Sequence, residues 1–497
     1  MRTLRGIYRS ISAILMVVAC LLLVAATTLA FRSAPGGVAS AGLGWGRLFE
    51  VVATDHGVQE SEALYDFSEP PEGLEEEEVA ELFGISNRFM VCSALQIMVG
   101  LVALGLMFSA IAQRRSGRWI WLSLGGVVAV VLLGFFLFGF SLAYPGEFSM
   151  GGLVSAELPA PVLSSMGEFA DPYDYGLPFT LWTDFLYQSL YAILAAALVM
   201  SLAAGQFRVP TLMLIASAVG VFGFPLVTSW LWGGGWLHGL GAYDFAGSAM
   251  LHLLAGGAAF ALVFLARILP PASPGFAAPT GAGRVKRKPL RLTRGSLGLY
   301  VIGAVWFVAL IFGVNAGSVL AWDVPVVAAV IRATAGAMLG GAAVALVIGQ
   351  YFAGRPVIMV TIAGGLAGWA AVSACADSCS FVHGLAVGSV AGAGGAMMLG
   401  MLDRFGFDDP FGVLAVSLVG GGVGMMAAGI LVHDTNLFVQ MLATTAVTSV
   451  GVALGGSLGL CAWLARVLCE APEVVLPVEQ DAVLAELREI EGREHCD

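Results

Sequence analysis

The sequence has 497 residues, of which 58% are apolar and only 11% are charged, and its mean hydropathy is +0.89. Soluble proteins carry about 25% charged residues, so a water-soluble enzyme is excluded and most of the chain is expected in lipid. The formal net charge is −11, but several acidic residues gather in SEPPEGLEEEEVAEL and at the end of the chain. The charge therefore says little about a ligand, and no nucleic-acid partner is expected.

The first 31 residues have the pattern of a secretory signal. A basic leader, MRTLRGIYRS, precedes an apolar run from Ile11 to Ala30 and a few small residues. A cleaved signal is favoured over an uncleaved anchor helix, although the length suits both. Either fate exports residues 32–85, an acidic extracytoplasmic segment whose function is not readable.

The remaining chain predicts an all-α polytopic membrane protein. Runs of about 20 apolar residues, enough to cross a ~30 Å hydrocarbon core as helices, recur eleven times between residues 86 and 467. Their expected spans are 87–111, 118–143, 183–204, 208–230, 245–267, 297–320, 325–349, 357–374, 382–402, 411–432 and 438–466. Sixty-six glycines suggest that these helices pack closely through small residues.

The charges of the loops predict the orientation, because Lys and Arg favour the cytoplasmic side. QRRSGR follows the first span and GRVKRKPLRLTRGS follows the fifth, whereas the long loop after the second span, from YPGEFSMGG to EFADPYDYG, has neither Lys nor Arg. The core therefore begins outside, and the acidic tail, residues 468–497, ends in the cytoplasm. A multi-pass protein of the cytoplasmic (inner) membrane is expected.

Two spans share a spacing that suggests an inverted repeat. Asp244 precedes His252 by eight residues in the fifth span, Asp409 precedes Ser417 by eight in the tenth, and glycine follows soon after in both. Five helices per half would place these spans in opposite orientations. We expect two inverted five-helix repeats plus a last helix.

Three residues stand out on chemical grounds. His252 is the one histidine of six well inside an apolar run, which suits either a transport path or a structural hydrogen bond. Asp244 suits a helix N-cap, which is compatible with a role in a site. Trp232, at the outer end of the fourth span, suits an interfacial belt as well as a binding site.

Cysteines and other reactive groups point to no enzyme. The seven cysteines lack the spacing of a metal site, and only Cys375 and Cys379 are placed to form a disulfide. A membrane enzyme would need a nucleophile or a metal cluster deep in the bundle, and only His252 is suitable there. We expect no catalytic residues, no metal and no cofactor.

Five ordered motifs resemble the ammonium transporter, methylammonium permease and Rhesus family. They are FGFSLAY, DFLYQSLY, WLWGGGWL followed by YDFAGSAMLHLLAG, FGVNAGS and FDDPFGVLAVSLVGGGVG. The resemblance implies an eleven-helix fold of two inverted halves, assembled as a homotrimer, with a path for ammonium or ammonia, and for methylammonium, through each subunit.

The resemblance also implies an extracellular recruitment site that holds ammonium by cation–π contact and a hydroxyl group. The matching positions here are Trp232, Tyr191 and Ser318, with Tyr191 standing where phenylalanine is usual. A second phenylalanine that closes the family's pore matches Val314. A valine would leave a wider constriction, or one refilled by a neighbour such as Phe312.

The family's paired pore histidines match His252 and Ser417. Imidazole exchanges protons near neutral pH, whereas a serine hydroxyl does not ionise in that range, so the family's relay cannot operate unchanged. Either the smaller serine admits water and ammonium passes as an ion, or the chain senses ammonium through Trp232, Ser318 and Asp244 without conducting it.

Two further family positions and one partner follow from the resemblance. Gln188 matches a residue beside the pore, although packing explains a polar side chain there as well, and Asp244 matches the acidic residue that supports the recruitment site. The family's tail often binds a cytoplasmic nitrogen-regulatory signalling protein. The tail here departs from the usual motif, which counts against that partner.

Overall fold

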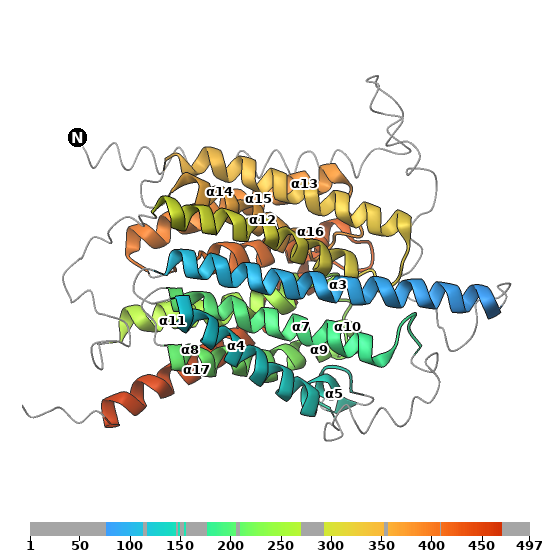
Figure 1. Ribbon diagram of the computed structural model, residues 1–497, viewed down its shortest axis with the longest axis horizontal. Coiled ribbons are helices and arrows are strands. Elements are labelled where there is room, and N and C mark those ends of the chain that lie inside the picture. The colour runs from blue at the N-terminus through green and yellow to red at the C-terminus, as the bar shows by residue number, and fades with distance from the viewer. Residues whose placement is uncertain are drawn as a thin grey trace, which may run out of the picture.

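The computed structural model describes residues 76–112, 117–145, 148–149, 154–155, 176–204, 209–269, 293–351, 356–407 and 409–469. These residues form a bundle of long helices that run roughly along the longest axis of the molecule (Figure 1). The predicted signal or anchor, most of the acidic segment 32–85 and nearly all of the tail lie outside the described residues.

The described elements are, in chain order, α3 (Glu76–Ile111), α4 (Gly117–Gly134), η1 (Phe135–Gly139), α5 (Phe140–Ala143), β1 (Phe148–Ser149), β2 (Val154–Ser155), α7 (Leu181–Met200), η4 (Ser201–Ala204), α8 (Val209–Ala218), η5 (Val219–Gly223), α9 (Phe224–Leu231), α10 (Trp236–Gly239), η6 (Ser248–Leu253), α11 (Leu254–Ile268), α12 (Arg294–Gly317), α13 (Val324–Gly349), α14 (Val357–Val372), α15 (Phe381–Phe405), η7 (Leu414–Val419), α16 (Gly420–Leu431) and α17 (Leu437–Cys469). The two short strands pair in antiparallel fashion, with Phe148 opposite Ser155. Helices dominate, as the hydropathy pattern predicts.

Ten of the helical spans within the described part of the chain are long and apolar enough to cross a membrane. The eighth expected span corresponds to α14, which has 16 residues and so a length of about 24 Å. It is short for a crossing, and most of its residues are buried. The described residues thus hold ten membrane-spanning helices and one shorter apolar helix.

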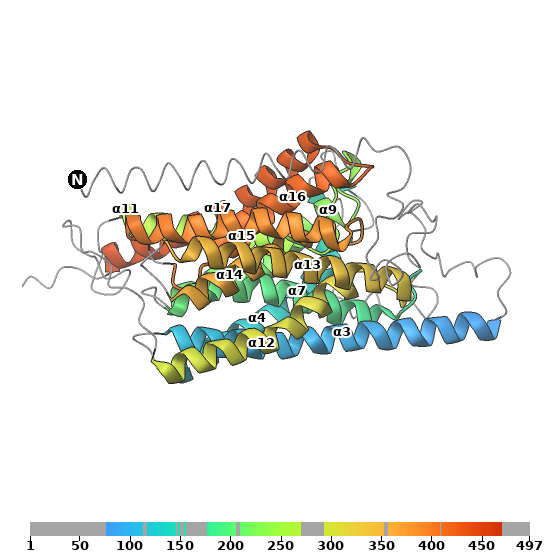
Figure 2. The same cartoon turned by 90° about the horizontal axis from the view of Figure 1, so that it is seen from above.

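The first span is longer than the apolar pattern indicates. We expected it to begin at residue 87, but α3 begins at Glu76 and extends past the other helices (Figures 1 and 2). Glutamate is a good helix former, and Val79 and Phe83 on this extension are buried with Leu82 packed against them. Hydropathy alone misses such a polar extension.

Four π-helical segments interrupt the helices among the described residues, namely η1, η5, η6 and η7. A π-helical turn inserts one extra residue into an α-helix, and such turns are frequent at functional sites. The last two carry His252 and Ser417, respectively. They place both residues at irregular turns in the middle of the bundle.

Close approach of backbones explains the abundance of glycine. On α15, Gly384, Gly388 and Gly392 recur every four residues and face the backbone of α13. A Cβ atom added to Gly388 would lie 1.9 Å from the Ala337 carbonyl oxygen, and one added to Gly392 would lie 2.3 Å from that of Gly341. Helices gain little from the hydrophobic effect between themselves in lipid, so this contact between small residues holds the pair together.

The outer surface of the bundle is apolar, whereas polar side chains lie inside. Large apolar side chains stand exposed on many helices, for example Leu122, Phe222 and Leu339. Within the bundle Gln188, Asn315 and Thr334 are buried. This reversal of the soluble pattern fits a protein whose surroundings are lipid.

The glycine contacts predict a sharp positional dependence of stability. We expect Gly388→Ala to lower the midpoint of thermal unfolding in detergent, because the new methyl group would collide with the Ala337 carbonyl, and overpacking typically costs about 1–3 kcal/mol. Gly422→Ala on α16 is the matched control, since a Cβ atom there meets no atom within 4 Å. Equal unfolding midpoints for the two variants would contradict this account of the α13 and α15 contact.

Candidate functional site

Two aromatic residues meet near the start of the segment that leads to η6. Trp232 ends α9, and its ring centroid lies 5.8 Å from that of Tyr191 on α7, with the ring planes at 65°. The Trp232 indole Nε1 donates a hydrogen bond of 2.6 Å to the Asp244 carbonyl oxygen. The indole is therefore held in one orientation.

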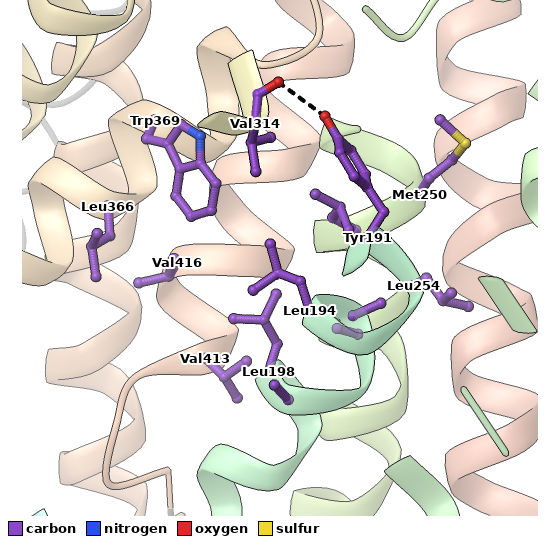
Figure 3. Packing of buried hydrophobic residues seen from close by; sticks show 14 of the residues in the cluster. Tyr191, Leu194, Leu198, Met250, Leu254, Val314, Leu366, Trp369, Val413 and Val416 are labelled. Atoms are coloured by element: carbon purple, nitrogen blue, oxygen red, sulfur yellow. Dashed lines mark hydrogen bonds between the residues drawn. The ribbon is translucent and has the colours of Figure 1, made fainter. Parts of the chain in front are cut away.

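Hydroxyl groups gather beside these rings. The Tyr191 and Ser318 hydroxyl oxygens lie 2.7 Å apart and share a hydrogen bond. Tyr191 also lies within donating distance of the Val314 carbonyl oxygen at 3.0 Å (Figure 3), as does Ser318 at 2.9 Å. The structure thus brings Trp232, Tyr191, Ser318 and Val314 into one cluster, in which the Val314 carbonyl is a common acceptor for Tyr191 and Ser318.

Tyr187 extends this cluster, and our sequence reasoning missed it. Its hydroxyl lies 3.1 Å from that of Tyr191 and 2.9 Å from the Val314 carbonyl oxygen. A carbonyl oxygen has two lone pairs, so three hydroxyl groups cannot all donate to it at once. The signal was present in the sequence, because Tyr187 precedes Tyr191 by four residues and so shares its helix face.

Asp244 fixes the beginning of η6. Its carboxylate accepts hydrogen bonds from the backbone N–H groups of Ser248, Ala249 and Met250 at 2.7, 2.8 and 3.2 Å. Burial raises the pKa of Asp244 to about 7, and the backbone N–H donors act against that shift. Asp244 is not the N-cap residue itself, which is Gly247, but its carboxylate binds three first-turn N–H groups where an N-cap side chain usually binds one.

Asp409 performs the same task for η7. Its carboxylate accepts hydrogen bonds from the backbone N–H groups of Gly412, Val413 and Leu414 at 3.0, 2.9 and 2.9 Å. Both aspartates are buried. The equal spacing noted in the sequence therefore corresponds to one local structure used twice.

His252 and Ser417 meet across the two capped segments. His252 Nδ1 lies 3.3 Å from the Ser417 Oγ, and both side chains are fully buried. Atoms this close leave no room for a water molecule between them. The other ring nitrogen, Nε2, has no hydrogen-bond partner in the part of the chain that the structure describes.

A buried tryptophan packs against the imidazole. Trp369 on α14 meets the His252 ring edge to face, with centroids 4.7 Å apart and planes at 86°. The indole Nε1 donates to the Asn315 Oδ1 at 3.2 Å, and the Ser373 hydroxyl donates to the same atom at 2.9 Å. Asn315 in turn donates to the Thr334 hydroxyl. No pattern in the sequence pointed to Trp369, because an apolar span supplies no reason to single it out.

The two groups of residues are connected through one short segment. The Tyr191 ring lies beside Gly247, 3.6 Å from the position of a Cβ atom there, and His252 follows five residues later. Below Tyr191 the buried side chains of Leu194, Leu198 and Val416 gather (Figure 3). On α7, apolar side chains therefore follow the hydroxyl groups of Tyr187 and Tyr191.

The remaining expected residue stands apart from these bonds. Gln188 on α7 is buried, and its Oε1 atom has no hydrogen-bond partner among the described residues. In the same part of the chain, no group of three or more His, Cys, Asp and Glu side chains is placed to hold a metal ion. The arrangement suits a small polar cation or its neutral base, which would need oxygen acceptors and aromatic faces.

Comparisons with known proteins agree on one family. The family model described as Ammonium Transporter Family matches residues 88–469. Ammonium transporter Amt1 of Archaeoglobus fulgidus is 29% identical over 362 residues, covering 71% of this chain and 83% of that protein. The ammonium transporter of Bacillus subtilis is 27% identical over 373 residues, covering 73% and 81%.

Solved structures share the fold. A structure described as a sensor Amt protein superposes with a TM-score of 0.64 at 21% identity, covering 77% of this chain and 94% of that one. The crystal structure of Saccharomyces cerevisiae Mep2 superposes with a TM-score of 0.62 at 19% identity, covering 76% and 85%.

The three hydrogen bonds to Asp244 predict that loss of its carboxylate lowers the stability of the protein strongly. We expect Asp244→Ala to lower the unfolding midpoint strongly, because three buried N–H groups would lose their acceptor, and an unsatisfied buried group costs roughly 1–3 kcal/mol. Asp323→Ala is the matched control: Asp323 caps α13 through one N–H group, that of Val326, and loss of an ordinary cap costs about 1 kcal/mol. A smaller loss for Asp244→Ala than for Asp323→Ala would refute the cap's importance.

Proposed function

Because the chain belongs to the ammonium transporter family, we propose that it carries ammonium or ammonia across a membrane, along a path within each subunit. The observation that supports this best is that side chains from several helices form two neighbouring polar clusters inside the bundle. Aromatic rings and hydroxyl groups at Trp232, Tyr191 and Ser318 come first, and the buried imidazole of His252 follows.

The first cluster is proposed as the recruitment site. Ammonium has four N–H donors and a positive charge, so it needs oxygen acceptors and electron-rich faces. The rings of Trp232 and Tyr191 offer π faces, each worth on the order of 0.5 to 2 kcal/mol. The hydroxyl groups of Tyr187, Tyr191 and Ser318 lie within donating distance of the Gly313 and Val314 carbonyls, and their oxygen atoms keep lone pairs that can accept from the ion.

Tyr191 adds a feature to that site beyond its ring. Its hydroxyl is hydrogen bonded to the Ser318 hydroxyl, and both hydroxyl groups also lie within donating distance of the Val314 carbonyl. Because a serine hydroxyl oxygen has two acceptor lone pairs, Ser318 can accept a hydrogen bond from an arriving ion while it donates to Val314. The side chain of Val314 is proposed to form part of the constriction below, with Gln188 beside the path.

The second cluster is proposed as an altered relay. Ser417 stands where the family has its second pore histidine, and a serine hydroxyl can hydrogen-bond to His252 but does not carry a proton onward as an imidazolium does. Ammonium would then cross as an ion, or His252 alone would exchange the proton. Selection among monovalent cations would be weaker than with two imidazoles.

A second candidate function uses the same residues without conduction. In that case Trp232, Ser318 and Asp244 bind ammonium and the occupied state is read elsewhere on the chain. The tight packing of His252 between Ser417 and Trp369 favours this alternative, because a path requires the neighbours of the ring to move aside.

The proposal also concerns assembly and location. We infer a homotrimer in the inner membrane, with the N-terminal segment outside and the tail in the cytoplasm, from the family resemblance and the loop charges. Methylammonium is proposed as a second substrate. A cytoplasmic signalling partner is not proposed, because the tail departs from the family's usual motif.

Electrical recording from the purified full-length protein in planar bilayers separates transport from sensing. We expect an ammonium-dependent current that falls at least severalfold in Trp232→Leu, because one π face and the bond to Asp244 are lost. Trp322→Leu is the matched control, since Trp322 is 41% exposed and packs against Phe89 instead. Saturable ammonium binding with neither a current nor a flux of ammonia into liposomes would overturn transport and support sensing.

Restoring an imidazole at Ser417 tests the altered relay. We expect Ser417→His to make the protein more selective among monovalent cations and to make ammonium flux depend on pH, because the substitution adds a second titratable imidazole. Ser417→Ala serves as the comparison, because it removes the hydroxyl without adding a titratable group. If Ser417→His leaves flux, pH dependence and selection unchanged, Ser417 is not the point of functional divergence.

A further inference from the structure

Two cysteines lie side by side in the loop between α14 and α15. Cys375 and Cys379 are both buried thiols, and their Sγ atoms are 3.5 Å apart. Tight turns bring them together, because the Cys375 N–H donates to the Val372 carbonyl and the Ser378 N–H donates to the Cys375 carbonyl. The backbone therefore holds the two sulfur atoms in contact before any bond joins them.

The same loop holds the segment that precedes η6. The Ser373 carbonyl accepts a hydrogen bond from the Ala246 N–H at 2.6 Å, and the Ala374 carbonyl accepts one from the Phe245 N–H at 3.1 Å. At the far side of the loop, the Asp377 carboxylate accepts a hydrogen bond from the Tyr243 hydroxyl. The loop thus contacts the chain on both sides of Asp244, the residue that caps η6.

These contacts place the cysteine pair at the same end of the bundle as Trp232 and Asp244. The loop charges predict that this end faces outward, away from the cytoplasm. Thiols in the cytosol are kept reduced, whereas exported segments sit in an oxidising compartment where disulfides persist. A pair of touching thiols at this end is therefore in the right place to be oxidised.

We propose that Cys375 and Cys379 form an intrachain disulfide, which fastens the loop that holds the Tyr243–Ala246 segment. Each thiol gives up its proton and the pair gives up two electrons as the S–S bond forms. The disulfide of an exported dithiol oxidant accepts them by thiol–disulfide exchange and leaves as two thiols. The Sγ atoms, 3.5 Å apart, have to approach to about 2.05 Å for the bond to form.

The reaction is expected before the loop is buried. In the folded protein the hydrogen bond to Cys379, together with burial, raises the pKa of the Cys375 thiol, and the thiolate is the form that attacks a disulfide. Cys375 and Cys379 are only 0% and 4% exposed, so an oxidant or a reductant has little access later. Once formed, the bond should resist mild reductants until the protein unfolds.

The consequence is local. A disulfide that closes so short a loop removes less entropy from the unfolded chain than one that closes a long loop, so its effect should be greatest in the loop itself. What it restricts is the position of the Ser373, Ala374 and Asp377 acceptors relative to one another. The bond would therefore keep the Asp244 segment in place at the mouth of the bundle, whether or not the protein conducts ammonium.

Differential alkylation of the full-length protein tests the proposal. Protein isolated from the inner membrane is denatured in acid without reductant, alkylated, digested and analysed by mass spectrometry. We expect the peptide that contains both cysteines to be unalkylated and lighter by two hydrogen atoms than its dithiol form, and to gain two alkyl groups only after reduction. Cys92 and Cys461, exposed on α3 and α17, are the internal controls and should be alkylated without reduction.

Recovery of this peptide with both cysteines alkylated before reduction, or with either one bridged to another cysteine, would overturn the proposal.

A second measurement tests whether the disulfide restricts the Tyr243–Ala246 segment. Hydrogen–deuterium exchange at the Phe245 and Ala246 amides should be at least severalfold faster in the Cys375→Ala, Cys379→Ala double variant than in the unmodified chain. Cys92→Ala should leave both rates unchanged. Equal rates in all three proteins would contradict the fastening role even if the bond is present.

Discussion

The structure depends on one constraint, that backbone N–H groups buried in a lipid-embedded bundle must find acceptors within the protein. At the start of η6 the chain is too irregular to satisfy its own donors, and the Asp244 carboxylate takes three of them. Asp409 solves the same problem at η7. His252 and Ser417 meet where the two segments that these aspartates cap, η6 and η7, pack against each other.

A consequence is that Asp244 contacts both the aromatic cluster and the segment that carries His252. The Asp244 carbonyl orients the Trp232 indole, while its carboxylate orients the turn that carries His252. The loop around Ser373 and Asp377 then holds the residues on either side of Asp244. Any displacement of this short segment would move the aromatic cluster and the imidazole together, so the two cannot be varied independently.

Much of the fold and part of the site could be predicted from the sequence. Apolar runs located the helices because burial in lipid requires long apolar stretches, and the Asp244 and His252 spacing identified the capped segment. The predicted start of the first span, residue 87, was wrong, because the polar first turns of α3 are helical without being apolar. Residue roles stay predictions, since contacts alone do not show what Trp232, Ser318 or Gln188 does with an ion.

Most of the features that the sequence did not reveal depend on contacts between distant parts of the chain. Trp369 and Asn315 are joined by hydrogen bonds between helices that are far apart in sequence, and only the fold brings them behind His252. The π-helical turns at η6 and η7 were equally hidden, because they arise from packing and capping instead of residue preference. Tyr187 differs from both cases, since its position one turn before Tyr191 was visible in the sequence.

The pairing of His252 with Ser417 limits what the imidazole can do. Its Nδ1 is committed to a hydroxyl at 3.3 Å and its face or edge to Trp369, which leaves Nε2 as the atom without a partner in the described chain. A buried polar atom without a partner is costly, but Gln188 Oε1 and Ser201 Oγ are in the same position among the described residues, so a missing partner does not by itself mark a site. An ammonium ion donates hydrogen bonds and ammonia accepts them, and either can bond to Nε2 according to the ring's tautomer. If the proposed path passes His252, Nε2 is therefore the imidazole atom that would meet the substrate.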